Sequence, residues 1–398
     1  MALALLHASR TLDDSRLMDS ARTLLRQAAE ATAHRPFSGA GLHTGTAGFA
    51  WVLLDFARHD ERYLPAVRRI AAQLGEQISS SPRIVPTGGV PFWRYDVISG
   101  AAGQLAAAAH LCAALGLQDD HALRTAAHQL VDYLCALTEA DEHQRFGWLV
   151  TPDFYPSDVP WYTECAPHGM YNLGFAHGLP GILAALCAAA VVGIGGSRVT
   201  GKVAEITDML ILNQLSDMVE GASWPLCLPA AENTGRLVTG SVQEPSRAAW
   251  CYGAPGIAIA LLGAASVLND DMVRETAVGA LSRVINTDLS HRNIFAPILC
   301  HGHAGMAAVY RRAYSATGVE EFRTMYANSF HAITELADKT RPFFVADEPQ
   351  RGNKVDDPGF LTGAAGTLLA LCGDSPEGLT GWDDILFLVP VRPDSLLA

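Results

Sequence analysis

The sequence has no cluster of basic residues and no apolar run with the length and composition of a membrane helix. It carries 28 Lys and Arg against 41 Asp and Glu, for a net charge of −13. Nucleic-acid binding needs grouped Lys and Arg, so we expect no nucleic-acid partner. The longest uncharged stretch, Gly178–Gly196, contains Pro180 and is rich in alanine. It predicts a buried helix and its exit loop rather than an integral membrane segment.

A secretory signal is also lacking, because the apolar run Ala2–Leu6 is short and is followed by His7 and Arg10. We therefore expect a cytoplasmic protein that reaches the membrane only at its periphery, through a complex. Its eight cysteines are expected to be reduced. Half of them lie in apolar helical patterns, which favours a role as small core residues: Cys112, Cys135, Cys187 and Cys372.

What the sequence does have is a repeated glycine pair. The pattern Gly-x-x-Gly occurs six times, and an apolar helical stretch follows each occurrence. The pairs are Gly45/Gly48, Gly100/Gly103, Gly178/Gly181, Gly253/Gly256, Gly302/Gly305 and Gly363/Gly366. Repeats of this length indicate one closed architecture rather than several domains, so we expect a single domain over residues 1–398.

Helical periodicity distinguishes two kinds of segment around these pairs. The segments before the pairs are amphipathic: Ser15–Glu30, Glu61–Gln77, His121–Leu137, Lys202–Val219, Asp271–Ile285 and Glu320–Leu336. Those after them, such as Ile182–Val192, Ile257–Leu268 and Met306–Tyr314, are apolar on all sides. A helix that is apolar all round is buried, and one with a charged face lies outside. The pattern predicts an all-α fold, an α/α toroid of six inner and six outer helices.

Three longer connections interrupt the helical pattern. Residues 79–94 and 145–173 are rich in proline, aromatic and turn residues, and we interpret them as inserted segments of loops or short strands over one mouth of the ring. Residues 223–246 form a similar stretch that leads into Cys251. Such connections are often plain surface loops, but long loops in compact domains frequently carry function.

The residue directly before the first glycine is polar in every repeat. Thr and Ser are favoured helix N-caps, so capping is one interpretation of Thr44, Ser99 and Thr362. Capping explains the remaining three less well: His177, Tyr252 and His301. We expect these six side chains at one end of the ring.

Two neighbouring repeats carry cysteine at the same position. Cys251 and Cys300 each lie two residues before a first glycine, and His301 follows Cys300. A Cys₂His set leaves the fourth tetrahedral position of a zinc ion open, as in catalytic sites, and soft thiolates favour zinc. His303 and Cys227 are sequence candidates for a fourth ligand, but neither occupies this position of the repeat. The alternative is that these are ordinary buried cysteines.

The composition of this set also indicates the type of reaction. Two thiolates cancel the charge of Zn²⁺ and make it a weak Lewis acid, yet it can still deprotonate a thiol bound in the open position. The bound thiolate stays nucleophilic. Hydrolytic zinc sites use His₃ or His₂Glu instead, so this set favours sulfur alkylation over water activation.

Three stretches resemble the lanthionine synthetase C-like cyclases. They are Trp250–Gly256 (WCYGAPG), Cys300–Gly302 (CHG) and Gly174–Gly181 (GFAHGLPG), and the resemblance extends over the chain because all six glycine pairs fit. It implies an α/α toroid with one zinc at the mouth, in some members with a small β-containing insertion. The implied activity is addition of a peptide cysteine to dehydroalanine or dehydrobutyrine, giving lanthionine or methyllanthionine. The chain's length implies a free-standing cyclase without a fused dehydratase.

The resemblance also implies roles for single residues. Cys251, Cys300 and His301 match the zinc ligands, and His177 matches the acid/base residue. The family's site arginine, tyrosine and aspartate match Arg247, Tyr252 and Asp96. The implied partners are a dehydrated precursor peptide and, in a biosynthetic complex, a separate dehydratase and a transporter.

The chemistry requires such residues independently. Addition of a thiolate to the β-carbon yields an enolate, which a histidine such as His177 can protonate. Arg247 can stabilise the enolate oxygen, and Asp96 can orient His177. Each also has an ordinary interpretation: Asp96 as a cap, Arg247 in a surface ion pair, Tyr252 in packing. His43 lies at the cysteine position of the first repeat, where we expect a packed or capping histidine.

Three other functions stay open at this point. One is addition of glutathione or another small thiol to dehydroamino acids by a related protein. Another is a non-catalytic partner that binds a modified peptide within a synthetase complex. The last is an α/α-barrel glycosidase, which would need two opposed carboxylates at the ring mouth, where this sequence has histidines and cysteines.

Overall fold

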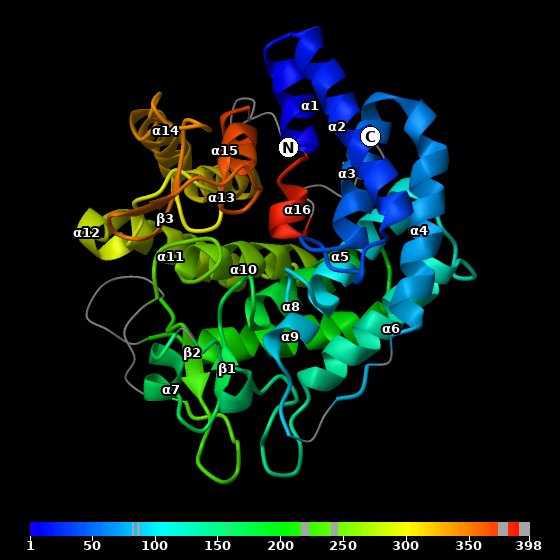
Figure 1. Ribbon diagram of the computed structural model, residues 1–398. Coiled ribbons are helices and arrows are strands. Elements are labelled where there is room, and N and C mark those ends of the chain that lie inside the picture. Colours follow the sequence, from blue (N-terminus) through cyan, green and yellow to red (C-terminus); the bar gives the residue numbers. More distant parts are fainter. Residues whose placement is uncertain are drawn as a thin grey trace.

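The computed structural model describes residues 1–81, 83–85, 88–157, 159–215, 223–239, 246–372 and 381–389, excluding the side chains of residues 289 and 290. The described chain is mainly helical, and its helices form a ring (Figure 1). Part of the predicted connection 223–246 and the end of the predicted helix 202–219 lie outside these residues.

An apolar helix follows each glycine pair, and these helices form the inner layer. Successive ones contact each other along the chain, which arranges them around a common centre. Their side chains are buried on nearly all faces, as the apolar pattern predicts. They are α3 (Thr46–His59), α5 (Ala101–Leu115), α8 (Leu179–Val191), α10 (Ala254–Leu268), α13 (His303–Thr317) and α15 (Ala364–Leu371).

The amphipathic segments form the outer layer. Five of them pack on the inner helix that precedes them in the chain, and α2 packs on α1 (Ala2–Thr11). The bounds are α2 (Ser15–His34), α4 (Leu64–Ser79), α6 (Ala122–Leu137), α9 (Gly196–Leu212), α11 (Asp271–Asn286) and α14 (Glu320–Glu335). The predicted α/α toroid is thus confirmed.

Helix α1 is an addition to the predicted set of six inner helices. It contacts both α15 and α3, so it joins the last repeat to the first. Nε2 of the buried His7 lies 2.6 Å from Oδ2 of the buried Asp55 on α3. The sequence pattern missed α1 because it precedes the first glycine pair and is short.

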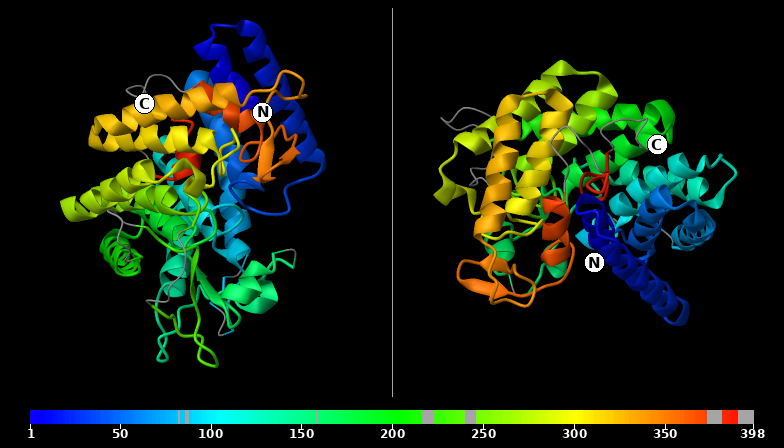
Figure 2. Two further views of the ribbon diagram at one scale, coloured as in Figure 1. Left: turned by 90° about the vertical axis from the view of Figure 1, so that its left-hand side faces the viewer. Right: turned by 90° about the horizontal axis from the view of Figure 1, so that it is seen from above.

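A short C-terminal segment, residues 381–389, lies inside the ring with α16 (Asp384–Phe387) at its centre (Figures 1 and 2). Its apolar side chains are buried, and the indole N–H of Trp250 donates to the carbonyl oxygen of Leu386 at 3.0 Å. Its carboxylates form buried ion pairs. Asp383 lies 2.9 Å from Arg311 of α13, and Asp384 lies 2.7 Å from Arg312.

The connections between repeats carry the small strands and the short helices. Within residues 145–173 lie η3 (Pro152–Phe154), α7 (Trp161–Cys165) and β1 (Met170–Asn172), and residues 79–94 contain η2 (Phe92–Arg94). Strand β1 pairs antiparallel with β2 (Cys227–Pro229), with Tyr171 opposite Leu228. Figure 1 shows α7, β1 and β2 gathered at one side of the helices. The other short elements are η1 (Glu61–Tyr63), α12 (Leu289–Arg292), β3 (Asp347–Gln350) and its partner β4 (Asn353–Val355).

The described helices include none that combines the length and the apolar character of a membrane span. The uncharged stretch 178–196 forms α8, its exit turn and the first residue of α9, and all but the end of α8 is buried. This agrees with its interpretation as a buried helix.

Candidate metal centre and catalytic site

Backbone hydrogen bonds tie together the loops that precede the inner helices. The residue two positions before a first glycine bonds to the equivalent residue of the next repeat at four places around the ring. The amide of His43 donates to Ile98 (2.9 Å), that of Ala176 to Cys251 (3.2 Å), that of Cys251 to Cys300 (3.3 Å), and that of Cys300 to Leu361 (2.8 Å). Equivalence in sequence therefore becomes contact in space, which brings the two cysteines together.

The glycine pairs make these close loops feasible. A Cβ on Gly253 would lie 1.8 Å from the carbonyl oxygen of Arg247, and one on Gly256 would lie 2.2 Å from that of Trp250. Gly253 also has φ +103°, a conformation that side chains with a Cβ rarely adopt. Both positions require glycine because the loop carrying Arg247 and Cys251 folds back onto the start of α10.

The first glycine of each pair is itself the N-cap of the inner helix, without a side-chain cap. The capping interpretation of Thr44, Ser99 and Thr362 is therefore wrong. The hydroxyl of Thr44 in the first repeat instead donates to the hydroxyl of Ser99 in the second (3.1 Å). Thr362 donates to Asp357 at 2.5 Å.

Cys251, Cys300 and His301 form a group whose ligand atoms all lie within 4.8 Å of one another. In the part of the chain that the structure describes, this is the one group of three or more His, Cys, Asp or Glu so arranged. Cys251 is buried, and the other two are partly buried. Two sulfur atoms and one imidazole nitrogen at this separation fit a tetrahedral zinc ion with one open position. His303 and Cys227 do not belong to the group.

Hydrogen bonds and charges within this group favour a cysteine thiolate. Without a metal, the Cys300 thiol donates to Cys251, which lowers the pKa of Cys251 and raises that of Cys300. Burial alone would lower the pKa of His301, but the hydrogen bonds to Asp347 and Cys251 raise it to about 9. These interactions favour the thiolate form of Cys251.

Asp347 is a part of this site that the sequence did not reveal. Its Oδ1 lies 2.9 Å from Nε2 of His301, and it begins strand β3. Asp347 is buried, and it follows His301 by 46 residues outside the repeated pattern. No motif or spacing marks it. A carboxylate on one ring nitrogen fixes the tautomer and leaves the other nitrogen as a ligand.

His177 and Asp96 are brought together from different repeats. Nδ1 of His177 lies 2.7 Å from Oδ2 of Asp96, whose side chain is almost fully buried. The other oxygen of Asp96 accepts from the amides of Ser99 and Gly100, at 2.8 Å each. Asp96 therefore braces the turn before α5 and orients His177 at the same time. His177 follows Ala176, whose amide donates to the carbonyl oxygen of Cys251, so the loop that carries His177 runs alongside the loop that carries Cys251.

Tyr252 joins the histidine to the inserted segment. Its ring centroid lies 6.2 Å from that of His177, and its hydroxyl accepts from Asn172 at 3.0 Å. The hydroxyl also hydrogen-bonds to Tyr162 of α7. Burial raises the pKa of Tyr252 well above its usual value, so it stays a neutral hydroxyl. Gly174 makes room for this ring, because a Cβ there would lie 2.4 Å from it.

Arg247 is partly buried at the end of the loop that precedes α10. Its charge acts to lower the pKa values of both Cys251 and Cys300, although the bond between these thiols dominates their titration. Among the described residues its guanidinium has no ion-pair or hydrogen-bond partner, so the surface ion-pair interpretation finds no support there.

His43 faces the same end of the ring but is a packed residue. Its ring stacks on Phe360 at 5.7 Å, and its buried Nε2 has no hydrogen-bond partner within the described part of the chain. Burial, followed by the charge of His177, lowers the pKa of His43 to about 4. The structure thus agrees with the expectation of packing.

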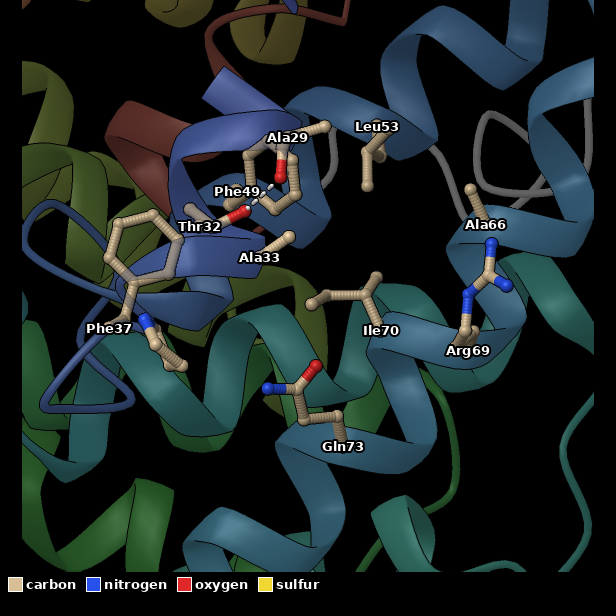
Figure 3. A pocket seen from close by; sticks show the side chains of 11 residues that line it. Ala29, Thr32, Ala33, Phe37, Phe49, Leu53, Ala66, Arg69, Ile70 and Gln73 are labelled. Atoms are coloured by element: carbon tan, nitrogen blue, oxygen red, sulfur yellow. Dashed lines mark hydrogen bonds between the residues drawn. The ribbon is translucent and has the colours of Figure 1, made fainter. Parts of the chain in front are cut away.

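A cavity of about 340 Å³ lies elsewhere, between α2, α3 and α4 (Figure 3). Its lining is mostly apolar, including Phe37, Phe49 and Ile70, and Arg69 is the one charged residue in it. It contains neither cysteine nor histidine, so it lacks the groups that thiol chemistry requires. The group of Cys251, Cys300 and His301 is therefore the candidate site.

Comparison with known proteins agrees with this geometry. Residues 1–386 match the family described as lanthionine synthetase C-like protein. The chain is 25% identical over 344 residues to the nisin biosynthesis protein NisC of Lactococcus lactis subsp. lactis, covering 83% of this chain and 72% of that protein. It superposes on the solved structure of nisin cyclase with a TM-score of 0.77 at 20% identity, covering 97% of this chain and 89% of that one. The chain belongs to the lanthionine synthetase C-like family.

Proposed function

We propose that this protein is a zinc-dependent cyclase that adds cysteine thiolates of a dehydrated peptide to dehydroalanine or dehydrobutyrine. The observation that carries the proposal is the adjacency of two groups. Cys251, Cys300 and His301 lie within ligand distance of one another, and the His177–Asp96 pair lies on the neighbouring loop. A thiolate site and a proton donor are the two components that this addition requires.

Cys251, Cys300 and His301 would hold the zinc ion, with Asp347 fixing the orientation of His301. When bound, the ion supplies acidity to a substrate thiol in the fourth position and keeps the resulting thiolate nucleophilic. The remaining steps belong to the side chains around it.

The addition forms a C–S bond at the β-carbon and moves the π electrons toward the carbonyl as an enolate. His177 delivers a proton to the α-carbon and later takes up the proton that the thiol released, so the product is an isomer of the substrate. Asp96 holds the imidazole in one orientation. Arg247 stabilises the charge that develops on the enolate oxygen, because its positive charge acts on Cys251 and Cys300 and is not paired with a carboxylate of the described chain.

The product test uses a synthetic peptide with one cysteine and one dehydroalanine, incubated with the zinc-loaded protein. Cyclisation leaves the mass unchanged and removes the thiol, so subsequent alkylation with N-ethylmaleimide adds no mass. The same peptide after incubation with chelator-stripped protein should be fully alkylated. Equal alkylation in both samples would refute the proposal.

The alternative activity, addition of an external thiol, is distinguished in the same assay. With glutathione present, an intermolecular addition increases the peptide mass by one glutathione, whereas cyclisation does not. The adjacent motifs do not discriminate between the two reactions, because both need a thiolate and a proton donor. The proposed biological partners are a dehydrated precursor peptide and the dehydratase and transporter that handle it.

A further inference from the structure

Two tryptophans of this protein are exposed, although the other five are at most 2% exposed. The exposed pair is Trp93, at 46%, and Trp161, at 38%. Both belong to the connections between repeats, residues 79–94 and 145–173, rather than to the helices of the ring. An exposed indole does not contribute the hydrophobic stabilisation that a buried one provides. Exposed aromatic groups that gather on one surface are typical of binding sites.

Trp93 is connected to the proposed proton donor through one ring. Its centroid lies 5.3 Å from that of Phe92, and Phe92 packs edge-to-face on His177 at 4.8 Å. These two contacts place the indole no farther from His177 than the length of about three residues of extended peptide. The indole can therefore contact a side chain within about three residues of one that reacts at His177.

Trp161 is connected to the same site by a second route. Its ring lies 5.5 Å from Tyr162, and Tyr162 hydrogen-bonds to Tyr252, which borders His177. The two routes are joined through the neighbouring residues Phe154 and Tyr155. Trp93 contacts Phe154 at 6.1 Å, and Tyr155 contacts Tyr162 at 5.6 Å. We call this set the aromatic rim: Phe92, Trp93, Phe154, Tyr155, Trp161 and Tyr162.

The backbone holds the two connections in this arrangement. The amide of Val90 donates to the carbonyl oxygen of Leu149 at 2.7 Å, and the Tyr155 hydroxyl donates to the carbonyl of Ala166 at 2.8 Å. A surface whose backbone is fixed in this way loses little conformational freedom when a ligand covers it. The aromatic rim is thus preformed beside His177 and Tyr252.

We propose that the aromatic rim is a subsite for apolar and aromatic side chains of the peptide that flank the residue that undergoes addition. This rests on the proposed function for the identity of the ligand. The rim is continuous with His177, and its exposed faces offer apolar surface rather than paired charges, so it selects peptides by the apolar character of their flanking residues. Peptides with polar residues at these positions bind less tightly.

The test measures binding of peptides that cannot react. The two probes are synthetic peptides with serine in place of the cysteine and alanine in place of the dehydroalanine, one flanked by phenylalanine and leucine and the other by serine and glycine. Calorimetry with the zinc-loaded protein should show tighter binding of the apolar-flanked probe by about tenfold, the change expected for partial burial of a large side chain. That probe should also protect the accessible tryptophans from quenching by acrylamide.

Trp93→Ala and Trp161→Ala should each reduce this preference several-fold and leave the zinc content unchanged. Trp93→Phe should keep most of it, because it retains an aromatic face. Met272→Ala is the matched control, since Met272 is 78% exposed on the outer helix α11 and should matter for neither probe.

Equal affinity of the wild-type protein for both probes, or no measurable binding of the apolar-flanked probe at millimolar concentration, would overturn the proposal. A preference that persists in the double variant Trp93→Ala/Trp161→Ala would do the same. The probes cannot cyclise. A protein that shows the preference without cyclising any substrate would therefore contradict the proposed function and not the subsite.

Discussion

Asp347 Oδ1 lies 2.9 Å from His301 Nε2, so a carboxylate from a small hairpin orients the one imidazole in the group of Cys251, Cys300 and His301. Asp347 is 6% exposed, and a buried carboxylate without this contact would be costly. The pair therefore links the stability of the β3–β4 hairpin to the geometry of the site just before the start of α13.

The first prediction concerns this pair. Asp347→Asn should weaken zinc binding about 10- to 100-fold, because the imidazole loses the charge that fixes its tautomer and strengthens it as a ligand. Competition with a chromogenic chelator measures the affinity. Asp208→Asn, at an exposed position on α9, is the control and should bind as the wild type does. Unchanged affinity in Asp347→Asn would remove Asp347 from the site.

His177→Ala should retain zinc and lose cyclisation by about 10²- to 10⁴-fold, the contribution of a positioned general acid. Arg247→Ala should also keep its metal while cyclisation slows. Elemental analysis and the alkylation assay, run on the same sample, separate the two effects. His331→Ala replaces a histidine that is 73% exposed on α14 and should change neither quantity. Loss of zinc from His177→Ala would make His177 a ligand rather than a proton donor.

The closure of the ring through α1 should depend on pH. Burial alone would raise the pKa of Asp55, but the hydrogen bond and charge of His7, with Arg58 and His59, lower it. A carboxyl whose pKa is lower in the folded state stabilises that state above its unfolded pKa of about 3.9, and this stabilisation is lost as the pH falls below that value. Asp55→Asn should therefore lower the free energy of unfolding by about 1–3 kcal/mol at pH 7 and flatten its acid dependence.

Urea unfolding at pH 7 and at pH 3.5 measures both effects. The exposed variant Asp208→Asn should follow the wild type at both values. A wild-type stability that does not fall with acidification more steeply than that of Asp55→Asn would contradict this account of the pair.

The buried charges that hold α16 inside the ring should be sensitive to removal of one partner. Arg312→Met removes the arginine that pairs with both Asp383 and Asp384 and leaves the pair between Arg311 and Asp383, and such a change typically costs about 3–5 kcal/mol. Arg274→Met, at an exposed pair with Asp271, should cost no more than about 1 kcal/mol. Thermal or urea unfolding compares the variants. Equal stability of the two would show that the segment 381–389 does not depend on these ion pairs.

The sequence was sufficient for those parts of the fold that repeat. The glycine pairs marked where each inner helix begins, and the shared position of Cys251 and Cys300 predicted their contact, because neighbouring repeats hydrogen-bond at that position. The pairing of His177 with Asp96 was expected as well and is present at 2.7 Å. The assignment of Asp96 came from the family resemblance, since its own motif is short.

What the sequence did not reveal lies outside the repeat. Helix α16 is only four residues long. In the sequence, Asp383 and Asp384 look like the carboxylates of an exposed turn, because nothing near them indicates their arginine partners, which lie about 70 residues earlier on α13. Asp347 was missed for the same reason, as a single carboxylate in a hairpin with no periodic pattern. Contacts between residues far apart in the chain leave no local signal unless a repeat makes their positions equivalent.

The most direct test of the central claim is zinc X-ray absorption of the purified protein, with and without a peptide that carries one cysteine and no dehydroamino acid. The account predicts one zinc per chain with two sulfur neighbours and one imidazole, provided by Cys251, Cys300 and His301. Adding the peptide should increase the sulfur neighbours from two to three, as its thiolate enters the open position. A protein without zinc, or a zinc site whose sulfur count does not change when the peptide binds, would contradict the account.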